Sequence, residues 1–137
     1  MHLDDGAAFV QSRPGRYDLL LVDGYDERGI PAVLSTQAFY DDCRDALAPD
    51  GVMSVNLFST DAQAHFGKIR QSFGDSALML EEPKMSNRVA FAWSGDPGGP
   101  GPIDPGAVLA ALPDEAGRQL GPGFARLAQA LEEAGLR

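Results

Sequence analysis

Short apolar runs alternate with amphipathic stretches through most of this chain. The run at residues 17–22 is almost wholly apolar, which is typical of a strand buried on both faces of a parallel sheet. Residues 52–57 predict a second strand, and residues 77–81 and 88–93 predict two more. Only a short connection separates the last two strands, so we expect them to be antiparallel to each other.

Between these strands, apolar residues recur at helical spacing, which predicts helices there. Residues 6–13 predict a short first helix. Ser35 is the expected N-cap of a second helix, which runs to about Ala48 and ends at Pro49–Gly51. Residues 61–73 predict a third helix, with Gly74 just past its end. This alternation predicts an α/β fold in which a parallel sheet carries a late hairpin.

A stretch rich in Gly and Pro, residues 95–106, is typical of a flexible linker. It separates a predicted α/β domain, residues 1–94, from a C-terminal helical segment, residues 107–137. The helical segment is amphipathic, because its apolar residues recur at helical spacing: Phe124, Leu127, Ala128, Leu131 and Ala134.

Composition narrows the classes of partner. Twenty acidic and eleven basic residues give a net charge of −9, which argues against nucleic acid. No window approaches the roughly 18 apolar residues of a membrane span, and the first residues lack the features of a signal peptide. A single cysteine, Cys43, excludes an internal disulfide, and His2 and His65 show no metal-ligand spacing. We therefore expect a cytoplasmic protein with no membrane contact and no metal.

Two carboxylates, Asp23 and Asp26, follow the first predicted strand directly. Ligands of open α/β sheets bind just beyond the carboxyl ends of such strands. Paired acids there can hold a cationic substrate or accept a proton from it. Tyr25 lies between the two acids, and Asn56 falls near the end of the next strand.

The Gly-rich turn that opens most nucleotide-binding sheets has no counterpart in this sequence, which contains neither G-x-G-x-x-G nor G-x-x-x-x-G-K. We therefore expect the chain to begin in the middle of the fold, with its first strands missing. One sheet edge and a large apolar surface would then stay open, which predicts a marginally folded chain or one that self-associates through that edge.

Several motifs occur in a family-specific order and spacing. They are Asp5-Gly6-Ala7-Ala8-Phe9, Tyr17-Asp18, Asp23-x-x-Asp26, Gly29, Leu34, Phe39-Tyr40 and Pro49-Asp50-Gly51-Val52. Together they resemble the C-terminal half of the spermidine synthase (polyamine aminopropyltransferase) family, which is built on the Rossmann-like class I methyltransferase fold. The resemblance covers roughly residues 2–93.

The resemblance implies roles for particular residues. Asp23 would be the base that removes a proton from an attacking amine such as putrescine, and Asp26 would help bind that amine. Tyr25 and Asn56 would line the amine site. The donor, decarboxylated S-adenosylmethionine, would be a substrate rather than a permanently bound cofactor, and its binding residues would be Asp5, Gly6 and Ala7. The loop from Gly24 to Leu34 would correspond to a gatekeeping loop.

This sequence departs from the family pattern at two of those positions. Family members commonly carry Ser-Asp-Pro where this chain has Tyr25-Asp26-Glu27, and often a Gln at the position of Asn56. The family usually forms oligomers, which implies either a homo-oligomer or a partner that supplies the missing N-terminal half.

Two further functions and several purely structural roles stay open. The chain could be a methyltransferase of the same fold that uses S-adenosylmethionine itself, or a non-catalytic half-fold or truncated remnant. Asp23 could cap a turn, and Asp5 could be only a helix N-cap. Three residues, Phe39, Tyr40 and Cys43, are expected in the core, and His65 is expected on the surface.

Overall fold

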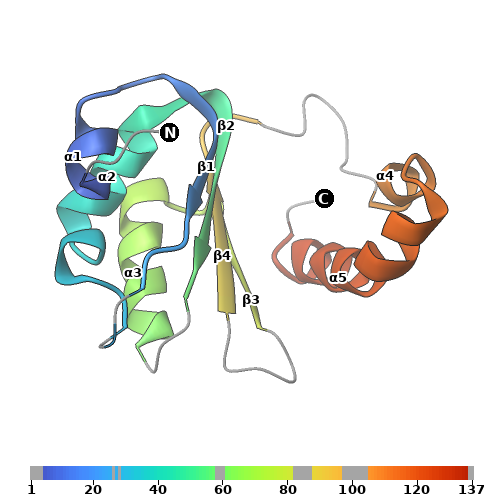
Figure 1. Ribbon diagram of the computed structural model, residues 1–137. Helices are drawn as coiled ribbons and strands as arrows, with labels where there is room; N and C mark the ends of the chain where they lie inside the picture. The colour runs from blue at the N-terminus through green and yellow to red at the C-terminus, as the bar shows by residue number, and fades with distance from the viewer. Residues whose placement is uncertain are drawn as a thin grey trace. The chain divides into compact units, whose positions relative to one another are not determined.

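A computed structural model describes residues 5–25, 27, 29–57, 61–81, 88–96 and 105–135 of the 137-residue chain (Figure 1). The chain divides into two compact units, residues 1–97 and residues 98–137. The first unit contains a four-stranded sheet with its helices, and the second contains two helices.

The sheet of the first unit has the strand order β1-β2-β4-β3. Its strands are β1 (Tyr17–Val22), β2 (Leu47–Asn56), β3 (Ala77–Glu81) and β4 (Arg88–Trp93). Strands β1 and β2 are parallel, whereas β4 runs antiparallel to both β2 and β3. The predicted parallel pair and the late antiparallel hairpin are therefore both confirmed.

The helices of the first unit lie together on one face of this sheet (Figure 1). They are α1 (Gly6–Gln11), the 3₁₀ turn η1 (Ala32–Leu34), α2 (Gln37–Ala46) and α3 (Ala62–Phe73). The predicted cap of α2 is wrong by one residue. The Thr36 hydroxyl accepts the Phe39 N–H at 3.0 Å, whereas the Ser35 hydroxyl is used in η1, where it donates to the Ala32 carbonyl. Gly74, with φ of 65°, ends α3 as predicted.

The segment Pro49–Gly51 does not separate helix from strand as predicted, because β2 already begins at Leu47. Tyr17 pairs with Leu47, but Leu19 pairs with Val52, so the ladder between β1 and β2 is irregular across this segment. Asp50 adopts a φ of 62°, in the left-handed region. The turn signal in the sequence is therefore real, but it marks an irregularity inside the strand.

The core lies between the helices and the covered face of the sheet. Its most deeply buried large side chains include Tyr40, Met53, Leu57, Ile69 and Cys43. Phe39 is also buried, so the predicted burial of Phe39, Tyr40 and Cys43 in α2 is confirmed. Burial raises the pKa of the Cys43 thiol to about 12, which fits a packed and unreactive side chain.

The prediction that β1 is buried on both faces is wrong. Leu20 and Val22 pack against the core, but Leu19 and Leu21 point the other way and are 58% and 69% exposed. Successive side chains of a strand alternate between faces, and the helices of the first unit cover only one face. An unbroken apolar sequence thus leaves an apolar surface on the edge strand.

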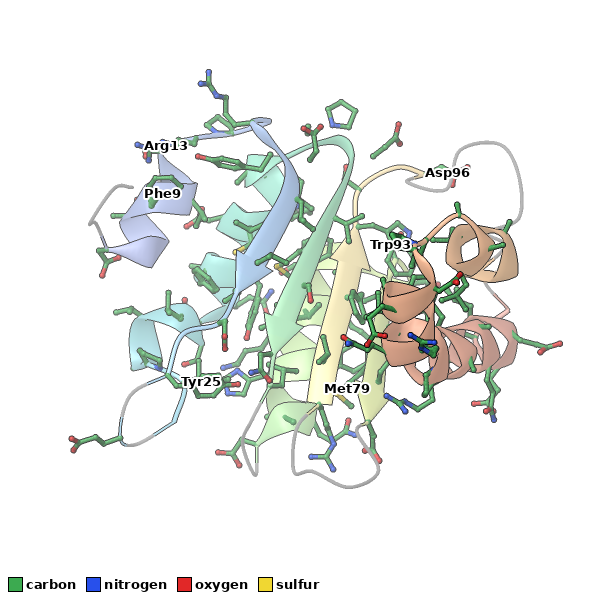
Figure 2. The ribbon with its side chains drawn as sticks, turned by 45° about the vertical axis from the view of Figure 1, so that its right-hand side comes forward. Phe9, Arg13, Tyr25, Met79, Trp93 and Asp96 are labelled. Atoms are coloured by element: carbon green, nitrogen blue, oxygen red, sulfur yellow. The ribbon has the colours of Figure 1, made fainter. Side chains whose placement is uncertain are left out.

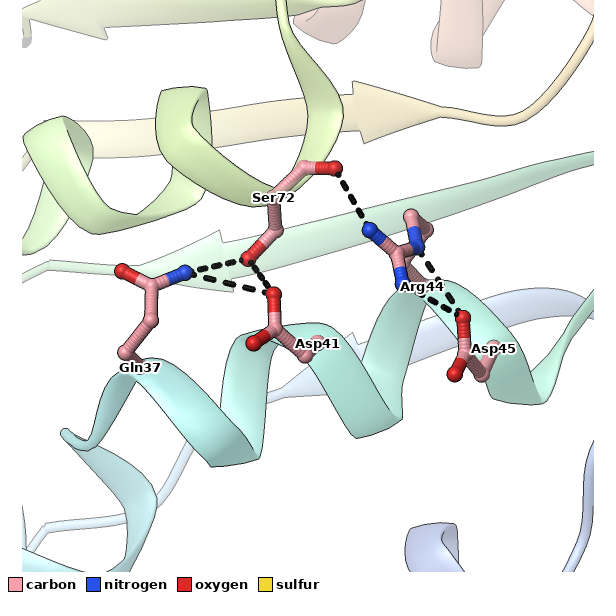
Figure 3. Close-up of polar contacts among 5 residues, drawn as sticks. All are labelled: Gln37, Asp41, Arg44, Asp45 and Ser72. Carbon is pink, nitrogen blue, oxygen red and sulfur yellow. Dashed lines mark hydrogen bonds and ion pairs between the residues drawn. The ribbon is translucent and has the colours of Figure 1, made fainter.

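A cluster of polar side chains joins α2 to α3 (Figure 3). The buried Ser72 hydroxyl donates to Asp41 Oδ1 at 2.7 Å and accepts from Gln37 Nε2 at 2.7 Å. Arg44 donates to the Ser72 carbonyl at 3.2 Å and forms an ion pair with Asp45. These bonds fix the spacing of the two helices that lie beneath the sheet.

The second unit consists of α4 (Pro105–Ala110) and α5 (Asp114–Glu133), which pack against each other. Pro122 lies inside α5, and Leu131 is buried. Helix α4 begins at Pro105, within the segment predicted to be a linker. Among the residues that the structure describes, no helix combines the length and apolar character needed to cross a membrane.

Candidate active site

Two of the predicted site residues meet at the carboxyl ends of the parallel strands β1 and β2. Val22 pairs with Val55, so the next residues along each strand, Asp23 and Asn56, lie beside each other. The side-chain amide of Asn56 donates from Nδ2 to Asp23 Oδ1 at 3.1 Å. Asp23 itself is exposed, so its carboxylate is both oriented by Asn56 and open to a ligand.

Tyr25 is the third predicted residue in this cluster. Its side chain is half-buried, and its hydroxyl donates to the main-chain carbonyl of Asn56. Figure 2 shows Tyr25 beyond the arrowheads of β1 and β2, at the opposite end of the sheet from Asp96. Tyr25 therefore holds the main chain of Asn56, and the Asn56 side chain in turn binds Asp23.

The other polar atom of the Asn56 side chain is buried and has no partner among the described residues. Asn56 Oδ1 accepts no hydrogen bond from any of the described residues. A buried acceptor left unsatisfied costs roughly 1–3 kcal/mol. A ligand that carries N–H groups, such as an amine, would remove that cost if it could reach this atom.

The predicted donor-binding residues lie at the start of α1. Asp5 Oδ1 accepts the N–H groups of Ala7 and Ala8, both at 3.0 Å, so Asp5 is the N-cap of α1. This is the structural role that the sequence analysis left open for Asp5. Contact of Asp5, Gly6 and Ala7 with a nucleoside stays a prediction.

Leu34 connects this region with the Asp23 cluster. A Cβ atom placed on Gly6 would lie 3.5 Å from one methyl carbon of Leu34, and one placed on Gly24 would lie 2.6 Å from the other. One leucine side chain thus contacts both the start of α1 and the residue after Asp23. The loop that begins at Gly24 folds back so that the two groups of predicted residues lie close together.

Asp26 lies outside the described residues, so its part in the cluster stays a prediction. Within the described ranges, no group of three or more His, Cys, Asp or Glu side chains has a metal-binding arrangement.

A second polar pair, between α2 and α3, was not predicted from the sequence. The Tyr40 hydroxyl lies 3.1 Å from His65 Nδ1, and His65 is half-buried rather than on the surface as expected. Burial raises the pKa of Tyr40 and lowers the pKa of His65. Since a buried hydroxyl needs a partner, the placement of Tyr40 in the core was the signal that could have led to His65.

The sequence of this chain is similar to proteins of known family. The family model described as spermine/spermidine synthase domain matches residues 1–71. The polyamine aminopropyltransferase of Chromobacterium violaceum is 33% identical over 95 residues, which cover 68% of this chain and 36% of that protein. A probable polyamine aminopropyl transferase of Bifidobacterium longum is 33% identical over 95 residues, covering 64% of this chain and 21% of that protein. The chain thus spans about a third or less of the length of these two relatives.

Solved structures show the same fold. A spermidine synthase in complex with the transition state analogue AdoDATO matches 88% of this chain and 50% of its own, with a TM-score of 0.63 and 23% identity. Human methyltransferase-like protein 13 in complex with SAH matches 90% of this chain and 58% of its own, with a TM-score of 0.62 and 19% identity. These likenesses confirm the predicted Rossmann-like α/β fold.

Proposed function

Because this chain belongs to the spermine/spermidine synthase domain family, we propose that it forms the amine-binding side of an aminopropyl transfer site. The transfer would move an aminopropyl group from decarboxylated S-adenosylmethionine to an amine such as putrescine. The observation that carries the proposal is the hydrogen bond from Asn56 to Asp23 at the carboxyl ends of β1 and β2.

The chemistry of aminopropyl transfer requires a base at such a place. The amine nitrogen attacks the carbon next to the sulfonium, the carbon–sulfur bond breaks, and its electron pair stays on sulfur in neutral methylthioadenosine. At neutral pH the amine is an ammonium ion without a free electron pair, so it must lose a proton before its nitrogen can attack. The exposed carboxylate of Asp23 would accept that proton, directly or through water. General-base catalysis of this kind is worth about 10² to 10⁴ in rate.

The neighbours of Asp23 suit a cationic amine. Asn56 orients the carboxylate, and the buried Asn56 Oδ1 is an acceptor that an ammonium N–H could satisfy. Asp26 follows three residues later in the sequence and would add a second negative charge. The net charge of −9 favours the approach of a diamine over that of an anion.

The donor would bind on the side of α1. Its nucleoside would contact Asp5, Gly6 and Ala7. The Leu34 side chain lies between Gly6 and Gly24, so the donor and amine sites would be close together. The donor would arrive and leave as a substrate and product, so no permanently bound cofactor is needed. Most of the remaining rate enhancement would come from alignment of amine, carbon and sulfur.

Identification of the transferred group tests the proposal. The protein that carries this chain is incubated with putrescine and either decarboxylated S-adenosylmethionine or S-adenosylmethionine, and the products are identified by mass spectrometry. We expect an aminopropylated amine and methylthioadenosine from the decarboxylated donor only. A methylated product from S-adenosylmethionine alone would instead identify a methyltransferase.

A measurement of ligand binding tests the alternative that the chain is a non-catalytic half-fold. A ligand that binds the folded state stabilises it by mass action, about 2.7 kcal/mol at 100 times its Kd. We therefore expect methylthioadenosine to raise the melting temperature in proportion to the logarithm of its concentration. The absence of both product and stabilisation would contradict the proposal and favour a half-fold without catalysis.

A further inference from the structure

The side chain of Leu34 contacts two glycines from different parts of the first unit. A Cβ atom placed on Gly24 would lie 2.6 Å from Leu34 Cδ1, and one placed on Gly6 would lie 3.5 Å from Leu34 Cδ2. Apart from the flanking residues and the backbone of α1, no other atom of the described residues lies within 4 Å of either position. A methyl group of Leu34 therefore occupies the space that a side chain at position 24 would take.

Leu34, rather than the backbone, excludes a side chain at Gly24. Gly24 is not among the glycines with a positive φ, so its φ does not require glycine. Two non-bonded carbon atoms pack best at about 3.5–4.0 Å. The 3.5 Å contact at Gly6 is therefore ordinary, whereas 2.6 Å at Gly24 is a clash. A larger residue at position 24 would have to displace Leu34.

The two glycines belong to the two halves of the proposed site. Gly24 follows Asp23 directly in the chain. Gly6 is the first residue of α1, on the side proposed for the donor. Leu34 is partly buried and packs against the core, so its own position is anchored. Its side chain therefore sets how closely the main chain of the proposed base approaches the start of α1.

Helix α3 holds the segment that carries Leu34. Lys68 donates from Nζ to the Ser35 carbonyl at 2.6 Å, and the Lys68 carbonyl accepts the Gln37 side-chain N–H at 3.2 Å. A hydrogen bond from an ammonium group is roughly twice as strong as a neutral one. Since Ser35 comes directly after Leu34, the Lys68 ammonium fixes the main chain beside the leucine.

We infer that Leu34 is a positioning residue of the proposed transfer site. Its side chain sets the distance between the start of α1 and the main chain of Asp23, and Lys68 keeps it in place. The inference rests on the proposed function for what Asp23 and the donor do. The contacts themselves, and their effect on Asp23, are testable without any substrate.

A double-mutant cycle tests the contact between Leu34 and Gly24. Gly24→Ala should lower the melting temperature, whereas Gly6→Ala, which meets the same leucine at an ordinary distance, should not. In a Leu34→Ala background, Gly24→Ala should lower it much less, because the clashing methyl group is gone. Equal losses in both backgrounds would overturn the inference. So would the absence, in the wild-type chain, of nuclear Overhauser effects from the Leu34 methyl groups to the Hα protons of both glycines.

NMR of the Asn56 side-chain NH₂ group shows whether the contact reaches Asp23, because this group donates to Asp23 Oδ1. Leu34→Ala should shift the signal, and Leu34→Met, which nearly conserves volume, should leave it near its wild-type position. Lys68→Met, which removes the ammonium and keeps an apolar stem, should shift it as well. Val33→Ala is the matched control, since Val33 lies in the same 3₁₀ turn but is exposed. An unmoved signal in folded Leu34→Ala or Lys68→Met would overturn the inference.

A kinetic readout links the inference to the reaction. In the protein that carries this chain, Leu34→Ala should lower kcat for methylthioadenosine release on the order of 10- to 100-fold while KM for putrescine stays unchanged, because alignment is lost rather than binding. Leu34→Met and Val33→Ala should keep most of the rate. An effect of Leu34→Ala on KM alone would overturn the inference. If the wild-type protein releases no methylthioadenosine, the proposed function fails, and the NMR experiment still decides whether Leu34 positions Asp23.

Discussion

At the scale of single residues, the structure connects Asp23 to its surroundings through hydrogen bonds that use both the side chain and the main chain of Asn56. The Asn56 amide orients the carboxylate, and the Tyr25 hydroxyl binds the Asn56 carbonyl. An oriented carboxylate loses less freedom when it accepts a proton or an ammonium group, which favours a site held in advance of the ligand.

Tyr25→Phe tests the contribution of one of these bonds to stability. The variant leaves the half-buried Asn56 carbonyl without the Tyr25 donor, so we expect the free energy of unfolding to fall by about 1 kcal/mol. Urea unfolding followed by circular dichroism measures the change. Tyr17→Phe is the control, because the Tyr17 ring stacks on Phe9 and its hydroxyl forms no hydrogen bond with any of the described residues. Equal stability of the two variants would show that the Tyr25 bond contributes nothing.

The sequence predicted much of this cluster but not all of it. The position of Asp23 follows from a general rule, since ligands of open α/β sheets bind beyond the carboxyl ends of the strands. Tyr25 and Asn56 were expected in the site through the family resemblance. The contact of His65 with Tyr40 was not predicted, because helical periodicity assigns a residue to a face of the helix but does not identify the side chains packed against that face. The Tyr40 partner depends on how α2 and α3 cross, which is set by tertiary packing.

At the scale of secondary structure elements, the sheet and its helices are joined by a few specific contacts. Strand β2 turns irregularly at Asp50, and the Asp50 carboxylate accepts the Asp96 N–H at 2.7 Å just after β4. The end of β4 is thereby tied to the start of β2. The sequence signal at Pro49–Gly51 could show that the backbone turns, but not that β2 continues through the turn.

Gly95→Ala should break this tie. A Cβ atom on Gly95 would lie 2.3 Å from Asp50 Oδ1, and the residue has a φ of +64°. Gly15 has nearly the same φ, +65°, but a Cβ there would meet nothing within 4 Å. Gly15→Ala therefore measures the left-handed backbone cost, roughly 1–2 kcal/mol, and we expect Gly95→Ala to cost about 1–3 kcal/mol more. Thermal unfolding of both variants gives the difference, and equal losses would contradict the contact.

Ser72→Ala should change how stability depends on pH. The Ser72 hydroxyl is the largest cause that lowers the pKa of Asp41 below its usual 3.8. A carboxyl with a lowered pKa stabilises the folded state above its usual pKa, and that contribution is lost as pH falls through the folded value. In Ser72→Ala, the pKa of Asp41 should rise toward 3.8, and acid unfolding should begin at a higher pH.

Carbon-13 NMR of the Asp41 carboxyl group measures this shift directly. Asp75→Asn is the control, because among the described residues Asp75 has only an exposed ion pair with Arg70, so this variant should leave the pKa of Asp41 unchanged. An Asp41 pKa that is the same in wild-type and Ser72→Ala chains would show that the hydroxyl does not stabilise the carboxylate.

At the scale of the whole molecule, the most consequential finding is the apolar surface on β1. Leu19 and Leu21 are exposed on an edge strand. The apolar run alone predicted burial on both faces, whereas the expected lack of neighbouring strands predicted an open apolar surface. The periodicity of a strand shows which residues are apolar, but it cannot show whether another segment covers them. The apolar run therefore predicts the strand, but the exposure of its leucines depends on which other segments are present.

Self-association through this surface is the expected behaviour of the isolated chain. An unpaired edge with exposed leucines favours contact with a second copy. We expect sedimentation velocity to show a weight-average mass that rises with concentration, and Leu19→Lys combined with Leu21→Lys to lower it. A wild-type chain that sediments as a single monomer at all concentrations would contradict this expectation.

We propose Asp23 as the base of an aminopropyl transfer. The most direct measurement compares kcat for methylthioadenosine release in Asp23→Asn with kcat in the wild-type protein, at saturating decarboxylated S-adenosylmethionine and putrescine. Asp23→Asn is nearly isosteric but cannot accept the proton, so we predict a loss of about 10² to 10⁴, while Asp75→Asn keeps the full rate. An Asp23→Asn protein that works at the wild-type rate would contradict the proposed role of Asp23.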